Sequence, residues 1–209
     1  MGAAVSDVHR PARVPDLRTV RGADLLPLLP ALAALRIEVF RDWPYLYEGD
    51  AAYERGYLRA YADDPGAAVV VATLDGEPVG AATCQPMAST HGEVRAAFEA
   101  GGVDPATTCY FGESVLRRAH RGGGVGVGFF AAREAHARSL GLRRAVFVGV
   151  VRDPADPRRP PDHAPLDGFW RKRGYAPLPG VAVRLGWPEV GGAGEDVPHT
   201  LTAWSKDLA

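Results

Sequence analysis

A run of closely spaced glycines lies between an apolar segment and a helical pattern in the second half of the chain. It comprises Arg121-Gly122-Gly123-Gly124-Val125-Gly126-Val127-Gly128 and follows the apolar segment 110–116. Glycines between a strand and a helix leave backbone N–H groups uncovered and let an anion approach without meeting a Cβ atom. The helix expected from Val125 onward adds the positive end of its dipole. The pattern therefore predicts a binding site for a phosphate or pyrophosphate group.

Two common phosphate-binding motifs match this run poorly. A P-loop needs Lys-Ser or Lys-Thr after its glycines, and neither follows here. Residues 126–131 do match G-x-G-x-x-A, a variant of the dinucleotide fingerprint, with Asp153 available for a ribose. That fingerprint starts directly after the first strand of its domain, whereas this run begins several residues beyond Leu116 and past the middle of the chain. A nicotinamide-dependent oxidoreductase is therefore the less favoured alternative.

A third motif matches better. The pattern Arg121-x-x-Gly124-x-Gly126 lies a few residues beyond a strand that ends at Leu116. It resembles the (Arg/Gln)-x-x-Gly-x-(Gly/Ala) signature of the GNAT superfamily of N-acetyltransferases. The elements expected around the motif fall in that family's order, and Phe169-Trp170-Arg171-Lys172-Arg173-Gly174-Tyr175 looks like its later helix, which ends in Gly followed by an aromatic residue.

The resemblance implies that acetyl-CoA is the acyl donor. It implies that two strands splay apart beside the pantetheine arm, which puts the main chain of Val115 and Leu116 next to the thioester. The amide of Leu116 matches the family's donor to the acetyl oxygen. The pyrophosphate would be held by main-chain amides of Arg121, Gly122, Gly123, Gly124, Val125 and Gly126.

Glu113 is the candidate general base. It is a carboxylate within an otherwise apolar strand, where partial burial favours the protonated form and brings its basicity toward a useful range. The competing interpretation is a structural ion pair with a nearby arginine. Tyr110 is the second candidate, although an aromatic residue in a strand is usually part of the core.

The general acid of the family has no direct equivalent. Many members have a tyrosine four residues before the glycine of the later helix, and here that position is Trp170, whose indole cannot protonate a thiolate. His163, Tyr175 or a solvent molecule are the alternatives. A thiolate is also a tolerable leaving group without any acid.

Composition narrows the class of protein. With 24 basic and 25 acidic residues in 209, the net charge of −1 gives no electrostatic footprint for nucleic acid. Cys84 and Cys109 have no metal-type spacing, and the six histidines show none either, so no metal is expected. No apolar run is long enough to span a membrane and no signal peptide is apparent, which favours a cytoplasmic location.

The elements that must position these residues follow from periodicity and from turn residues. Strands are expected at 17–20, 68–73, 79–84, 110–116, 145–151, 181–187 and 200–205. Helices are expected at 23–40, 51–62, 94–100, 125–140 and 166–173. A hairpin with an Asp75-Gly76 turn precedes a strand–helix–strand crossover, whose two strands must be parallel.

The expected fold is a mixed α/β (α+β) sheet of GNAT type: mostly antiparallel, with one central parallel βαβ crossover and helices on both faces. Residues 1–15 are expected to form a mobile N-terminal tail and residues 16–209 a single acyltransferase domain. The expected activity is acyl transfer to a primary amine of a small molecule or peptide, by direct attack in a ternary complex. The alternatives are a non-catalytic acyl-CoA sensor and a degenerate domain that acts in a homodimer.

Overall fold

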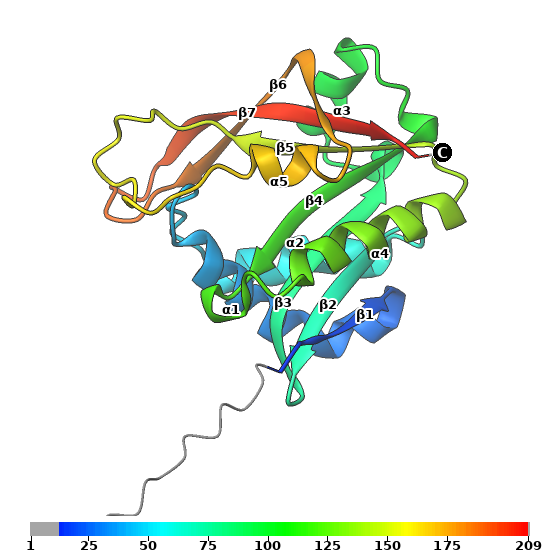
Figure 1. Ribbon diagram of the computed structural model, residues 1–209, viewed down its shortest axis with the longest axis horizontal. Coiled ribbons are helices and arrows are strands. Elements are labelled where there is room, and N and C mark those ends of the chain that lie inside the picture. The colour runs from blue at the N-terminus through cyan, green and yellow to red at the C-terminus, as the bar shows by residue number, and fades with distance from the viewer. Residues whose placement is uncertain (1–12, 209) are drawn as a thin grey trace, which may run out of the picture.

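Seven strands form one mixed sheet in the computed structural model, which describes residues 13–208. Their spatial order is β1-β2-β3-β4-β5-β7-β6 (Figure 1). They span β1 Asp16–Val20, β2 Ala68–Leu74, β3 Glu77–Pro86, β4 Thr108–Leu116, β5 Arg144–Val150, β6 Ala176–Pro188 and β7 Asp196–Asp207. Among the described strands, β4 and β5 are the one parallel pair, and the other neighbours are antiparallel. The predicted mixed sheet with one central crossover is confirmed.

Helices cover both faces of this sheet. Figure 1 shows α4 across one face of β2, β3 and β4, with α1 and α2 behind the same strands. The α-helices are α1 Leu29–Phe40, α2 Ala51–Asp63, α3 Gly92–Ala100, α4 Val125–Ser139 and α5 Asp167–Arg171. Short 3-10 turns are η1 Gly22–Leu28, η2 Met87–Ser89, η3 Pro105–Thr107 and η4 Arg118–His120.

The first predicted helix is divided in two. The sequence predicts one helix over residues 23–40, but the structure has the 3-10 turn η1 followed by α1. Pro27 lies within η1 and Pro30 in the first turn of α1. Proline has no N–H group and is accepted in the first turn of an α-helix but not in its interior. The apolar spacing still holds, because Leu25, Leu32 and Leu35 are buried.

The predicted Asp75-Gly76 turn agrees with the structure, and a glycine also ends α4. Asp75 and Gly76 both have positive φ, 51° and 88°, in the two-residue connection between β2 and β3. Gly141 has φ 75° and ends α4, where the Leu142 N–H donates to the Ala137 carbonyl at 3.0 Å.

Three further sequence expectations concern the N-terminal tail, the two cysteines and membrane-spanning segments. Of the predicted tail 1–15, residues 1–12 lie outside the described part of the structure. Cys84 and Cys109 are free and buried, as expected of small core residues. No helix within residues 13–208 is long and apolar enough to cross a bilayer.

Candidate active site

The parallel pairing of β4 and β5 is very short. It joins Thr108 to Arg144, Cys109 to Ala145 and Tyr110 to Val146, and then stops. Both strands continue, β4 paired with β3 and β5 paired with β7, so each keeps a partner on its outer side. Figure 1 shows β4 and β5 close together at one end and diverging toward the start of α4. The diverging halves therefore present unpaired main-chain groups to one another.

The main-chain groups on the open edge of β4 follow from strand geometry. Arg117 N–H donates to the Val79 carbonyl of β3 at 3.0 Å. Successive residues of a strand direct their N–H groups to opposite edges, so the Leu116 N–H points into the gap, and Ser114 shares its side. Val115 differs from the expectation: its carbonyl oxygen faces β3, 3.1 Å from the ideal Cβ position of Gly80. The sequence motif did not single out Ser114.

A bulge in β4 lies just before this edge. The register with β3 shifts between Ala82 and Cys84, and one extra residue of β4 is accommodated there. A Cβ atom on Gly112 would lie 2.4 Å from Thr83 Oγ1, so only glycine fits. The Glu113 N–H donates to Thr83 Oγ1 at 3.1 Å, and Arg133 of α4 donates to the Glu113 carbonyl at 3.3 Å. Hydrogen bonds from two other elements therefore fix the bulge.

Arg133 is a buried residue beside the candidate site that the sequence did not reveal. Its side chain is buried, contacts the rings of Phe111 and Phe130, and also donates to the Thr83 carbonyl at 3.3 Å. Burial lowers the pKa of its guanidinium. An arginine in an amphipathic helix usually indicates a solvent-facing position, so the sequence had no signal for this contact.

The glycine loop leads from η4 into α4. Gly122 and Gly124 have φ of 85° and 86°, a left-handed conformation that favours glycine, and no other atom lies within 4 Å of a Cβ built on Gly122, Gly123 or Gly124. In the described chain, the N–H groups of residues 122–127 donate to no main-chain carbonyl. The loop is therefore an exposed set of donors at a helix N-terminus, and these residues fit an anionic group.

Two predicted members of this loop differ from the rest. The Arg121 N–H already donates to the Arg118 carbonyl at 3.2 Å, and its Nε donates to the Leu116 carbonyl at 3.0 Å. Arg121 thus connects the loop to the end of β4 instead of offering its amide. A Cβ on Gly126 would lie 3.2 Å from the Phe169 ring of α5, so this glycine also permits close packing.

Glu113 lies on the other side of β4, in a buried ionic cluster. Its Oε1 is paired with Arg36 Nη1, and its Oε2 accepts a hydrogen bond of 2.8 Å from the Tyr57 hydroxyl. The same guanidinium pairs through Nε with Glu54, which is fully buried. The structural ion pair that the sequence left open is therefore present. Its partner Arg36 lies 77 positions away along the chain and gave no sequence signal.

Burial of this cluster changes the acidity of its other members. It raises the pKa of Tyr57 well above the ordinary value, and the nearby Glu113 raises it further. Burial alone would lower the pKa of Arg36, but Glu113, Tyr57 and Glu54 raise it well above its ordinary value. Tyr57 therefore stays a hydrogen-bond donor to Glu113, and Arg36 stays charged.

Two other candidate acids or bases, Tyr110 and Tyr175, are buried in the core. Tyr110 lies in a buried apolar cluster against Phe98, and burial raises its pKa, so the structure gives it a core role. Tyr175 is buried and donates to Glu134 at 3.2 Å, and burial raises its pKa too. Trp170 packs on Trp204.

His163 is the candidate acid that lies nearest the surface. Its ring meets the edge of Trp43 at 6.0 Å between centroids, and burial followed by Arg159 lowers its pKa. The neighbouring Asp162 pairs with Arg118 of η4 at 2.7 Å. The loop between β5 and α5 therefore contacts both η4 and the aromatic loop before α2.

That aromatic loop, residues 41–50, is held by Arg152, another residue that the sequence did not reveal. Arg152 donates to the carbonyls of Pro44 at 2.6 Å and Tyr45 at 2.7 Å, and pairs with Glu189 at 2.5 Å. The Trp187 indole donates to the same Tyr45 carbonyl at 3.0 Å. Trp187 therefore helps to hold this loop in place.

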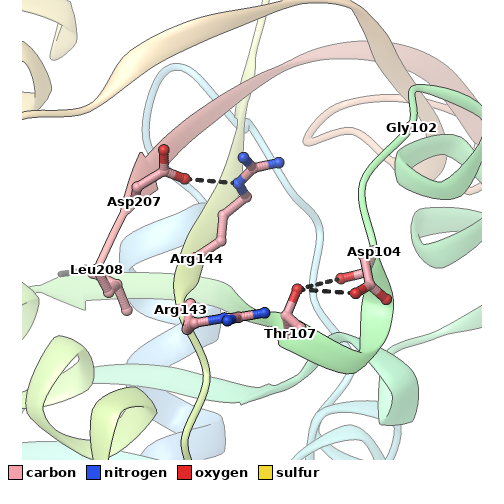
Figure 2. Close-up of a pocket in the computed structure, with 7 residues that line it drawn as sticks. All are labelled: Gly102, Asp104, Thr107, Arg143, Arg144, Asp207 and Leu208. Atoms are coloured by element: carbon pink, nitrogen blue, oxygen red, sulfur yellow. Dashed lines mark hydrogen bonds and ion pairs between the residues drawn. The ribbon is translucent and has the colours of Figure 1, made fainter.

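A surface hollow of about 470 Å³ lies elsewhere, at the opposite end of β4 and β5. Figure 2 shows Arg144 paired with Asp207 and Thr107 bonded to Asp104, with Arg143 pointing toward Thr107. It is far along both strands from Leu116 and contains none of the predicted site residues. Residues 13–208 contain no group of three or more His, Cys, Asp or Glu side chains arranged for a metal ion.

Comparison with known proteins identifies the family and the fold. The model of the Acetyltransferase (GNAT) family matches residues 32–159, more than half of the chain. A search of the curated proteins found no match.

Similar solved structures come from three bacteria. They are a ribosomal-protein-alanine N-acetyltransferase from Brucella melitensis (17% identity, TM-score 0.60, covering 92% of this chain and 99% of that one), a phosphinothricin acetyltransferase from Sinorhizobium meliloti in complex with AcCoA (15%, 0.59, 94% and 90%) and an N-acetyltransferase from Staphylococcus aureus Mu50 (13%, 0.59, 93% and 99%). At these identities the likeness concerns the fold.

Proposed function

Because the chain belongs to the GNAT family of acetyltransferases, we propose that it transfers an acetyl group from acetyl-CoA to a primary amine by direct attack in a ternary complex. The observation that supports this most strongly is the three-residue pairing of β4 with β5, next to an open glycine loop. A sheet that opened for no ligand would leave these main-chain groups unpaired at a cost.

The donor side consists of main-chain groups. The N–H groups of Gly122 to Val127 hold the pyrophosphate, with the α4 dipole behind them. The Ser114 and Leu116 edge of β4 pairs with the amides of the pantetheine arm, and the Leu116 N–H donates to the acetyl oxygen as negative charge develops. Bound acetyl-CoA supplies a thioester as the acyl donor.

The acceptor side consists of side chains around Glu113. Its carboxylate takes a proton from the acceptor's ammonium group, directly or through a water molecule, and the neutral amine then attacks the thioester carbonyl. The aromatic loop with Trp43 and Tyr45 forms one wall, and aromatic rings beside a carboxylate suit a cationic amine. The indole of Trp170 cannot act as an acid, so the thiolate takes its proton from solvent. The acceptor is the primary amine of a small molecule or a peptide.

Calorimetry with acetyl-CoA and with NAD tests the cofactor assignment. The expected result is micromolar or tighter binding of acetyl-CoA and none of NAD, and the reverse would overturn the proposal. A panel of primary amines is then incubated with acetyl-CoA, and free thiol release is followed. Release that depends on the amine supports direct transfer.

The Glu113→Gln variant separates an enzyme from an acyl-CoA sensor. In an enzyme it lowers kcat by about 100-fold or more, the range for loss of a general base, with unchanged affinity for acetyl-CoA. A sensor has no turnover to lose, so equal and negligible thiol release from both forms with every amine contradicts the catalytic assignment.

A further inference from the structure

One guanidinium is shared between two buried carboxylates in the ionic cluster behind β4. Arg36 of α1 pairs through Nε with Glu54 Oε2 and through Nη1 with Glu113 Oε1. The side chains of Glu54 and Glu113 are 0% and 8% exposed, and that of Arg36 is 10% exposed. With both acids ionised, this trio has one negative charge more than its single cation can balance.

This arrangement is not expected to stabilise the fold. Burying ions costs free energy that a single pair barely recovers, and a second carboxylate on the same cation adds repulsion. Hydrogen bonding around Glu54 is also uneven, because the Tyr47 hydroxyl faces its carboxylate while its Oε1 has no hydrogen bond of regular geometry among the described residues. Buried groups left in this condition call for a functional explanation.

The groups that face Glu113 come from every element packed against it. Arg36 lies on α1, and Glu54, Tyr57 and Tyr61 lie on α2, where the two tyrosine hydroxyls are 3.0 Å apart. The remaining groups are Tyr45 of the aromatic loop, Thr83 of β3, Tyr110 of β4 itself, and Arg133 of α4. Among residues 13–208, Arg36 is the one cation whose guanidinium contacts the Glu113 carboxylate, while Arg133 contacts its main-chain carbonyl.

We propose that Arg36 is a positioning residue for Glu113 and that Glu54 sets how strongly it acts. Arg36 and the Tyr57 hydroxyl fix both oxygens of Glu113 in place. Because Glu54 shares the guanidinium, its negative charge opposes that of Arg36. The charged form of Glu113 is therefore stabilised less than it would be by an arginine paired with Glu113 alone. A carboxylate that is fixed yet only partly compensated is better suited to take a proton. This inference rests on the proposed function, in which Glu113 is the base.

Removing Arg36 and removing Glu54 should have opposite effects on the protonation of Glu113. Arg36→Met removes the cation that favours the charged carboxylate, so the titration midpoint of the Glu113 carboxyl moves up relative to the native protein. Glu54→Gln removes a competing anion and leaves the guanidinium to Glu113, so the midpoint moves down. Arg36→Lys keeps the charge and restores part of the native midpoint.

The direct readout is a carbon NMR titration of the ligand-free full chain with labelled glutamate carboxyls. The Glu113 signal is assigned by its loss in Glu113→Gln, and Glu54 and Glu113 are fitted as a coupled pair. Opposite shifts in Arg36→Met and Glu54→Gln support the inference. If Arg36→Met does not fold, Glu54→Gln alone decides, because an unchanged or raised midpoint in that variant overturns the inference.

The acid limb of the pH profile of kcat/KM gives the second readout. It should move in the same directions as the NMR midpoints, whereas a purely structural role of Arg36 would lower the rate without moving the limb. These outcomes are distinct from failure of the proposed function. Unchanged midpoints with amine-dependent thiol release contradict the role of Arg36 only, and absence of acetyl-CoA binding contradicts the function itself.

Discussion

The proposed donor side of β4 consists of main-chain groups, and the proposed acceptor side consists of side chains. On the proposed donor side, the groups open to a ligand are main-chain groups from two adjacent stretches of chain, the end of β4 and the glycine loop. On the acceptor side, Arg36, Glu54, Tyr57 and Glu113 come together from three elements through buried side-chain contacts. The first is a local backbone shape that depends on glycine, and the second is an electrostatic network that depends on packing.

This difference determines how each side responds to mutation. A backbone cradle tolerates side-chain changes around it but fails when its left-handed residues are replaced, since β-branched residues rarely adopt positive φ. A buried ionic network responds to the removal of any one charge, because the remaining charges are left without compensation. The two sides should therefore separate in experiments that measure folding and cofactor affinity independently.

The largest effect is expected from Arg36→Met, which leaves Glu54 and Glu113 buried without a cation. We expect a loss of about 3–5 kcal/mol in the free energy of unfolding, measured by urea denaturation. The matched control is Glu54→Gln, which keeps one anion on one cation and should cost about 1 kcal/mol or less. Equal losses in the two variants would contradict the shared-guanidinium description.

The next effect concerns the donor side. Gly124→Val places a β-branched residue at φ 86° in the loop, and we expect acetyl-CoA affinity to fall by about 10- to 100-fold through loss of one or two donors to the pyrophosphate. Gly141→Val is the control, because Gly141 has φ 75° with equal space at the other end of α4. Similar affinities of the two variants, measured by calorimetry, would count against the loop as the cofactor site.

Gly112 connects the two sides, because the bulge that it permits lies beside Glu113. In Gly112→Ala the new methyl would lie 2.4 Å from Thr83 Oγ1 and 2.5 Å from the Tyr61 hydroxyl. We expect a loss of about 1–3 kcal/mol in stability and a lower kcat, since the hydroxyls that hold Glu113 must shift. Thermal unfolding and turnover measure the two effects, and an unchanged kcat would show that the bulge does not position the base.

The smallest effect is a pH dependence on the acceptor side. Burial, followed by Arg152, lowers the pKa of His199, which is stacked on Trp187 at 3.7 Å. The folded protein then binds fewer protons at this site than the unfolded chain, so stability falls as the pH drops below about 6.5. Urea midpoints at about pH 7.5 and 5.5 should differ less in His199→Gln than in the native protein. An equal difference would contradict this assignment.

The donor side could be predicted from the sequence because its information is local. The glycines, the strand before them and the helix after them are contiguous, so residue types and spacing indicate the turn, the helix start and the parallel crossover. The edge that the Val115 carbonyl faces could not be inferred from the motif, because it depends on the register with β3. Nor did the motif indicate that the Arg121 N–H already donates to the Arg118 carbonyl of η4.

The acceptor side could be predicted only in part. Glu113 was recognisable as a carboxylate in an apolar strand, but nothing in the pattern of α1 indicates that Arg36 turns inward to meet it. Arg133 and Arg152 were hidden for the same reason, since an arginine in a helix or a loop is ordinarily a surface residue. Long-range charge pairing has no periodicity along the chain, so it becomes visible only in three dimensions.

Amide hydrogen exchange with and without coenzyme A tests the central claim most directly. If main-chain groups at the end of β4 and in the glycine loop hold this ligand, its addition slows exchange at Leu116 and at residues 122–127. The amides around the hollow of Figure 2, such as those of Arg143 and Arg144, stay unchanged. Binding of coenzyme A that leaves exchange at Leu116 and the glycine loop unaltered would contradict the account.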